Sequence, residues 1–267
     1  MSHEYSLDRL SSLTQQNKQK KDGILMIRAD EKAGSNLSAN ILYEIGNAET
    51  VLFLSGGKTP TQLYTILAHG QRIKIGSVAM IDERYGKRMH KNSNELMIDR
   101  TGLLDYLKRG NIPFYPILND DLDIEETARY YDQTVRYLLS NFSRSAAVLG
   151  IGEDGHIAGI APNRADFINP FFSQELGQRL VSYFIDPIPM ASEENSGLSH
   201  GFGERVTMTI KGLLKMDVLI VLAFGKTKLA ALLSLFEEGT VEQFPLRLLK
   251  DKSISAKTIL ITDQNLK

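Results

Sequence analysis

The sequence contains no cysteine among its 267 residues. This absence excludes disulfide frameworks, thiolate zinc sites, iron–sulfur clusters and a cysteine nucleophile. Long hydrophobic runs are also missing, since no stretch reaches the roughly 18 consecutive apolar residues of a membrane-spanning helix. Residues 1–23 are polar and lack the apolar core of a signal peptide. We therefore expect a cytoplasmic protein that does not enter a membrane.

An excess of charge of either sign is missing as well. The 31 Lys and Arg residues against 32 Asp and Glu residues leave a formal net charge of −1. Nucleic acids and anionic membranes select proteins with a basic excess on one face, so neither is an expected partner, although a local basic pocket is compatible with this balance. His3, His69 and His90 show no metal-ligand spacing, and we expect no metal site.

Six short runs rich in Val, Ile and Leu predict buried strands. They lie at residues 24–27, 51–54, 78–81, 146–149, 218–223 and 258–261. Amphipathic stretches separate most of them, with apolar residues three and four apart, as in Leu37, Ile41 and Ile45. Residues 127–142 predict one further long helix. The alternation predicts an α/β fold, an open and largely parallel sheet with helices on both faces and Rossmann-type topology, in one domain spanning 1–267.

Helix and strand periodicity both fade over residues 163–203, where Ser, Glu, Gly and Asn are frequent. A segment of this length inside a compact domain is often functional, so a lid and a simple disordered loop both remain open. Gly197–Gly201 matches the G-x-S-x-G pattern of hydrolases. The pattern requires a preceding strand, which is missing here, and we interpret it as a chance match.

The clearest motif follows the strand at 51–54, where Ser-Gly-Gly at 55–57 leads into a helix. Thr59 is the expected N-cap, and Gln62 completes a capping box. A glycine turn before a helix N-terminus presents backbone N–H groups to an anion, and the Ser55 and Thr59 hydroxyls add donors. The turn therefore predicts a phosphate site, while a tight turn without a ligand is the alternative.

Gly57-Lys58-Thr59 resembles the end of a nucleotide-binding P-loop. The first glycine of that loop would fall at Leu52, so the P-loop is rejected. The dinucleotide fingerprint is also matched, by three glycines between 150 and 155. Pro162 interrupts the helix that this fingerprint needs, which disfavours NAD.

Charged residues follow two other predicted strands. Asp82 and Arg84 end the strand at 78–81, at the edge where open α/β sheets bind ligands, although such a run is also common on solvated surfaces. Asn92 with Glu95 predicts a capped helix start. A further strand begins at Arg205.

Asp154 and His156 flank Gly155 in a glycine-rich loop after the strand at 146–149. A histidine at this position can accept a proton near neutral pH, and a neighbouring carboxylate can orient it or stabilise its charged form. A surface histidine in a glycine turn is the structural alternative.

Taken in order, these segments resemble the 6-phosphogluconolactonase family, within the superfamily that also contains glucosamine-6-phosphate deaminase. The resemblance covers the chain from about residue 30 to the end, except for 163–203. The motifs that carry it are SGGKTP at 55–60, DER at 82–84, NSN at 92–94, LGIGEDGH at 149–156 and ERVTMTI at 204–210.

The resemblance implies hydrolysis of a phosphorylated sugar lactone, expected to be 6-phosphogluconolactone, without a metal or organic cofactor. It implies that His156 activates the attacking water, with Asp154 beside it. The implied substrate- and phosphate-binding residues are Ser55, Gly56, Gly57, Lys58, Thr59, Asp82, Arg84, Gly155 and Arg205. The implied partner is a small sugar phosphate, and we expect a monomer or a small homo-oligomer.

Two alternatives stay open, and the first is a glucosamine-6-phosphate deaminase or aldose–ketose isomerase. The deaminases carry a glutamate five residues after this histidine, where the chain has Ala161, which cannot relay a proton. A non-catalytic sugar-phosphate sensor is the second alternative. Ile157 and Gly159 replace the Thr and Ser usual in the lactonase motif, and the lysine usual before the RVT arginine is missing, so the substrate itself is the least defined part of this prediction.

Overall fold

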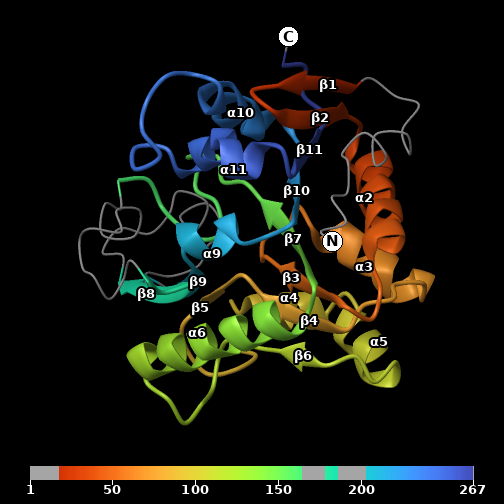
Figure 1. The fold of residues 1–267 in the computed structure, drawn as a ribbon, viewed down its shortest axis with the longest axis vertical. Coiled ribbons are helices and arrows are strands. Elements are labelled where there is room, and N and C mark those ends of the chain that lie inside the picture. The colour runs from red at the N-terminus through yellow and green to blue at the C-terminus, as the bar shows by residue number, and fades with distance from the viewer. Residues whose placement is uncertain (1–17, 164–177, 186–202, 267) are drawn as a thin grey trace.

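The structure is a computed structural model that describes residues 18–163, 178–185 and 203–266. Its main sheet has eight strands in the order β1-β2-β11-β10-β7-β3-β4-β6 (Figure 1). Apart from the antiparallel β1–β2 hairpin, neighbouring strands are parallel, which confirms the predicted fold class. The strands are β1 (Lys18–Lys21), β2 (Ile24–Arg28), β3 (Thr50–Leu54), β4 (Ser77–Met80), β6 (Phe114–Tyr115), β7 (Arg144–Gly150), β10 (Val218–Ala223) and β11 (Thr258–Thr262).

Helices cover both faces of this sheet. In Figure 1, α2, α3 and α5 lie on one side of the strands, and α6 and α9 lie on the other. No helix in the described part of the chain is long and apolar enough to cross a membrane. The helices are α2 (Glu31–Ile45), α3 (Thr61–Gly70), α4 (Asn94–Asp99), α5 (Leu103–Arg109), α6 (Ile124–Asn141), α9 (Ile210–Leu214), η2 (Lys226–Lys228), α10 (Leu229–Leu235), η3 (Pro245–Lys250) and α11 (Lys252–Ser255).

The apolar runs become strands because both faces of the sheet are covered. Every residue of β3 and of β10 is buried, as a central parallel strand requires. The six predicted strands are therefore present, with ends that differ by one or two residues. The helix predicted over 127–142 is α6, and Asp123 starts it with a complete capping box.

Two predicted helix caps are wrong by a residue or more. Thr59 does not cap α3, because Pro60 already has helical backbone angles and occupies the N-cap position without a side-chain bond, so Gln62 completes no capping box. The N-cap of α4 is Ser93 rather than Asn92, and its hydroxyl accepts a hydrogen bond from Leu96 N at 3.1 Å.

A second, smaller sheet consists of β5 (Asp82–Arg84), β9 (Glu204–Met208) and β8 (Val181–Ile185), antiparallel and in that order. Residues 82–84 are thus a strand and not the polar end of one. Ile81 links the two sheets. Its N–H donates to Leu54 O in the main sheet at 2.9 Å, and its carbonyl accepts from Met208 N in the small sheet at 2.8 Å. One continuous run of chain therefore serves both sheets.

β8 lies within the segment expected to be irregular, so that prediction is wrong for residues 181–185. The choice between a lid and a disordered loop falls mainly on residues 164–177 and 186–202, outside the described part of the chain, as does the G-x-S-x-G match at 197–201.

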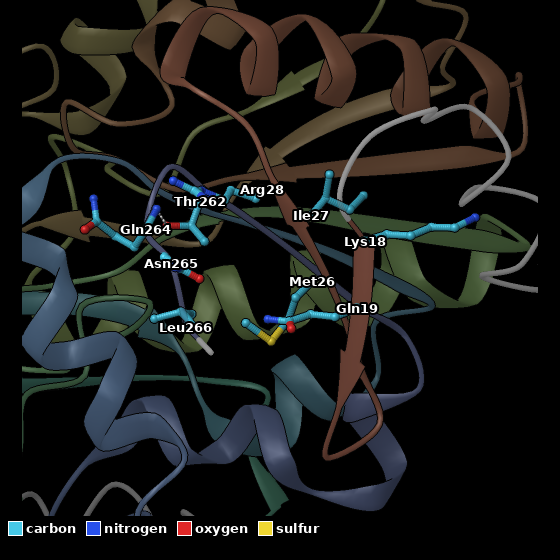
Figure 2. A pocket seen from close by; sticks show the side chains of 9 residues that line it. All are labelled: Lys18, Gln19, Met26, Ile27, Arg28, Thr262, Gln264, Asn265 and Leu266. Carbon is cyan, nitrogen blue, oxygen red and sulfur yellow. Dashed lines mark hydrogen bonds between the residues drawn. The ribbon is translucent and has the colours of Figure 1, made fainter.

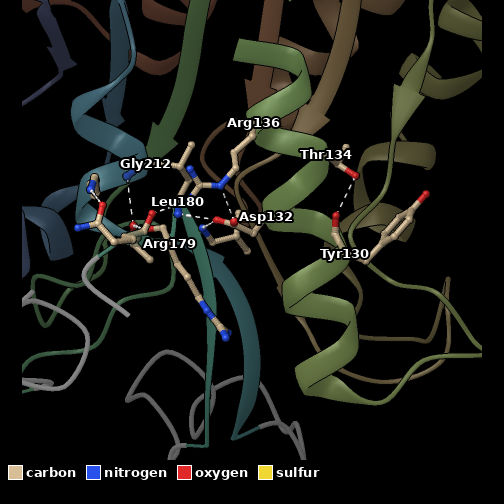
Figure 3. A network of polar contacts seen from close by, with 11 residues as sticks. Tyr130, Asp132, Thr134, Arg136, Arg179, Leu180 and Gly212 are labelled. Carbon is tan, nitrogen blue, oxygen red and sulfur yellow. Dashed lines mark hydrogen bonds and ion pairs between the residues drawn. The ribbon is translucent and has the colours of Figure 1, made fainter. Parts of the chain in front are cut away.

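The start of β8 is anchored to α6 (Figure 3). Asp132 Oδ1 accepts hydrogen bonds from Leu180 N at 2.5 Å and from Val181 N at 2.9 Å, while Arg136 Nε donates to Asp132 Oδ2 at 2.7 Å. Since β8 pairs with β9, this contact also fixes the strand that carries Arg205.

Candidate active site

The loop after β7 brings Asp154 and His156 into direct contact. Asp154 Oδ1 lies 2.6 Å from His156 Nδ1 and also accepts a hydrogen bond from His156 N at 3.1 Å. Burial of Asp154 opposes its ionisation, but the hydrogen bonds and charge of His156 outweigh it, and the pKa of Asp154 is lowered. An ionised Asp154 places the proton on Nδ1, which leaves Nε2 as the nitrogen that accepts a proton. The two side chains are 27% and 21% exposed, so water reaches them.

Glycines allow this loop to fold tightly around the pair. A Cβ on Gly152 would lie 2.0 Å from His156 Nδ1, and Gly155 has a φ of +86°. On its other side Gly155 packs against Phe244, and its carbonyl accepts a hydrogen bond from Leu246 N at 3.0 Å. Two of the three glycines that matched the dinucleotide fingerprint, Gly152 and Gly155, are thus explained by the packing of this loop.

Replacing Gly155 by alanine is expected to lower the melting temperature by about 5–15 °C and to abolish activity. The new Cβ would lie 2.1 Å from the Phe244 ring, in a backbone conformation that alanine rarely adopts. Thermal unfolding measures the effect. Gly225→Ala is the matched control, because Gly225 has a φ of +93° but no heavy atom within 4 Å of its Cβ position. An equal loss in both variants would show that the Phe244 contact contributes nothing.

The small sheet presents two arginines and an aspartate on one face. Its register pairs Arg84 with Arg205, and Asp82 with Thr207. Side chains alternate along a strand, so these four share one face of the sheet. Arg205 is only 3% exposed. Arg84 and Arg205 thus lie opposite each other across the two strands, with the Asp82 carboxylate on the same face of the sheet.

The same face meets the histidine loop. Thr207 Oγ1 donates to the carbonyl of Ala158. A Cβ on Gly159 would lie 3.3 Å from Asp82 Oδ2, which puts the Asp82 carboxylate against that loop. The structure therefore brings Asp82 against the loop that carries His156, with Arg84 and Arg205 two residues further along the same face.

The Ser-Gly-Gly turn at 55–57 lies beside the same loop, because β3 and β7 are neighbours and end together. Ser55 is buried, and its Oγ accepts a hydrogen bond from Gly150 N at 3.2 Å, so this hydroxyl joins the two strand ends. Gly57 has a φ of +91° with open space at its Cβ position. Lys58 is exposed and Thr59 is half-buried. The Ser55 hydroxyl is thus engaged within the turn and at the end of β7.

Lys228 lies near the Asp154–His156 loop and was missed in the sequence. It ends η2, which follows β10 after two residues, and it is half-buried. Burial lowers the pKa of Lys228, while the nearby carboxylates of Glu153 and Asp154 oppose that shift. Its position in the sequence could have indicated it. Gly225 forms a turn after β10, and because β10 lies beside β7, this turn opens at the same edge of the sheet as the histidine loop.

The cavity drawn in Figure 2 is a different place. It has a volume of about 280 Å³ and lies between β1, β2 and the C-terminal tail. None of the predicted site residues lines it. Within the described residues, no group of three His, Asp or Glu side chains is arranged to hold a metal ion.

Fold and site together define an α/β protein with an Asp–His pair in the loop after a central parallel strand and two arginines paired across a small neighbouring sheet. The chain belongs to the family of glucosamine-6-phosphate isomerases and 6-phosphogluconolactonases, whose model matches residues 30–260. The resemblance inferred from the five motifs is thereby confirmed.

Individual relatives agree with the family. The chain is 31% identical over 132 residues to a probable 6-phosphogluconolactonase of Dictyostelium discoideum, covering 46% of this chain and only 55% of that protein. It is 28% identical over 203 residues to a 6-phosphogluconolactonase of Xylella fastidiosa, covering 73% of this chain and 75% of the relative.

Solved structures share the fold. A 6-phosphogluconolactonase from Plasmodium vivax superposes with a TM-score of 0.72 at 20% identity, covering 96% of this chain and 94% of that one. A monomeric glucosamine-6-phosphate deaminase superposes with a TM-score of 0.63 at 21% identity, covering 89% and 95%. The fold is therefore common to both activities, and the residues of the site must distinguish them.

Proposed function

We propose that this chain hydrolyses 6-phosphogluconolactone to 6-phosphogluconate, with His156 as the general base. The observation that carries the proposal is the 2.6 Å contact between Asp154 and His156 on a loop that meets the Arg84 and Arg205 face. The names of the curated relatives support the choice of substrate.

His156 Nε2 takes a proton from a water molecule as that water attacks the lactone carbonyl carbon. The tetrahedral intermediate then collapses, the ring C–O bond breaks, and the imidazolium returns its proton to the departing oxygen. Asp154 holds the ring in orientation and stabilises its charged form. Each turnover consumes one water and restores the neutral histidine, and no metal or cofactor enters these steps.

The phosphate end of the substrate is held by the cationic face of the small sheet. Arg84 and Arg205 supply charge-assisted donors, and the backbone of the 55–57 turn supplies further N–H groups. Lys58 and Thr59 border that turn, Lys228 adds charge from the β10 side, and Asp82 and Gly155 line the space between phosphate and histidine. Fixing the phosphate places the lactone carbonyl at His156.

Ala161 opposes the deaminase alternative. Ring opening and amine chemistry need an additional proton relay, and a buried methyl group at this position cannot provide one.

Purified protein with freshly generated 6-phosphogluconolactone, coupled to 6-phosphogluconate dehydrogenase, tests the function. We expect a rate clearly above the spontaneous opening of the lactone, which is measured without protein and subtracted. No excess rate would overturn the proposal. Ammonia release from glucosamine 6-phosphate would then indicate the deaminase, and thermal stabilisation by sugar phosphates without turnover would indicate the sensor.

A further inference from the structure

Glu83 is a buried carboxylate on the side of β5 that faces away from Asp82 and Arg84. Its side chain has no exposed surface, and burial raises its pKa to about 7 against the opposing effect of its hydrogen bonds. Four donors converge on its two oxygens, which are Arg84 N at 2.7 Å, Asn94 N at 2.8 Å, Ser93 Oγ at 2.9 Å and Glu95 N at 2.9 Å. A buried carboxylate is costly, and here it joins β5 to the first turn of α4.

The residues just before the three that contact Glu83 hold Arg84. Arg84 Nη1 donates to Asn92 O at 2.7 Å. His90 Nδ1 accepts a hydrogen bond from Asn92 N at 3.3 Å, so Nε2 carries the proton and donates to the backbone carbonyl of Arg84 at 3.0 Å. The Asn92 carbonyl thus contacts the Arg84 guanidinium, while the His90 side chain holds the Arg84 backbone.

Asn94 extends the same arrangement to the rest of the site. It is 2% exposed, and its Nδ2 donates to Asp82 O at 2.9 Å and to Asp82 Oδ2 at 3.0 Å. Its side-chain amide also packs on the glycine turn at 55–57, since a Cβ on Gly56 would lie 1.9 Å from Asn94 Oδ1. Asn94 therefore touches two separate parts of the site while Glu83 fixes its backbone.

We propose that Glu83 is a positioning residue for phosphate binding. From behind β5 it fixes residues 93–95. Asn94 in turn holds the Asp82 carboxylate and packs on the glycine turn at 55–57, and the adjoining Asn92 carbonyl holds the Arg84 guanidinium. Glu83 acts through these groups and does not touch the substrate. The proposal rests on the proposed function for its phosphorylated substrate, and binding of inorganic phosphate tests it separately.

Glu83→Gln tests the proposal, because it keeps the side-chain volume while one carboxylate oxygen becomes an NH₂ group that cannot accept from a backbone N–H. We expect KM for 6-phosphogluconolactone to rise roughly tenfold with kcat changed by less than about threefold, the loss of about one well-placed charged hydrogen bond. A purely structural defect would lower the active fraction and hence kcat, without this increase in KM.

Binding of inorganic phosphate, followed as thermal stabilisation, gives a readout that does not require turnover. Phosphate is expected to stabilise the wild type and to stabilise Glu83→Gln far less. If the wild type binds phosphate but does not hydrolyse the lactone, this difference still supports the positioning role while the proposed function fails.

Asp217→Asn is the matched control. Asp217 Oδ2 also accepts hydrogen bonds from a backbone N–H and a serine hydroxyl, both of Ser145, but at the amino ends of β7 and β10. We expect this variant to keep the wild-type KM and phosphate stabilisation. If Glu83→Gln does not fold, Ser93→Ala removes one donor to Glu83 together with the N-cap of α4, and it is expected to raise KM by about threefold. Wild-type KM and phosphate binding in the folded variant would overturn the proposal.

Discussion

Replacing His156 by alanine is expected to lower kcat by about 10²–10⁴-fold while KM stays within a few-fold of the wild type. His156 is the group that Asp154 orients with a free Nε2, and no other imidazole shares the loop after β7. Alanine leaves the phosphate contacts intact and removes only the base. The measurement is the coupled lactone assay at several substrate concentrations, with spontaneous hydrolysis subtracted.

His69→Ala provides the control for this result, because His69 is an exposed residue in the last turn of α3. It should retain wild-type kinetics. Equal melting temperatures for wild type and His156→Ala would show that the loss is chemical. A variant that lacks His156 and still turns over at the wild-type rate would remove this residue from the mechanism.

Replacing Arg84 by alanine is expected to raise KM for the phosphorylated lactone by about 10–100-fold. A charge-assisted hydrogen bond to phosphate contributes about 1.5–3 kcal/mol, which corresponds to this range. The effect on kcat should be smaller, because Arg84 lies on the small sheet with Arg205 and not on the histidine loop.

An unphosphorylated gluconolactone separates this role from a general disturbance of the site. Arg84→Ala should treat that substrate almost as the wild type does, since the missing guanidinium has no phosphate to meet. Arg109→Ala, an exposed arginine at the end of α5, should be unchanged with both lactones. Equal losses on the two lactones would contradict phosphate recognition by Arg84.

The main sheet could be predicted because its signal is strong and local. Strands buried on both faces must be continuous apolar runs, and β3 and β10 are such runs in full. The small sheet has no such signal, since β5 is three charged residues long and is held by partners over a hundred positions away. Its existence depends on tertiary pairing, which composition and periodicity do not contain.

The residues of the site also divide into those with a local sequence signal and those that only tertiary pairing brings together. The turn at 55–57 and the Asp154–His156 pair are readable because each motif is contiguous and follows a predicted strand. The pairing of Arg84 with Arg205 requires the register of two distant strands. Glu83 would be interpreted from sequence as solvated surface, and only the fold shows that it is buried.

Ile81 has a consequence for binding. Its N–H and carbonyl bond to different sheets, so backbone hydrogen bonds tie the strand that carries Arg84 to the strand that precedes the glycine turn. The spacing of the two groups proposed to hold the phosphate, Arg84 and the turn at 55–57, is thus established when the chain folds. The entropy of arranging these groups is lost during folding rather than on each encounter with substrate, which leaves more of the phosphate interaction free energy for affinity.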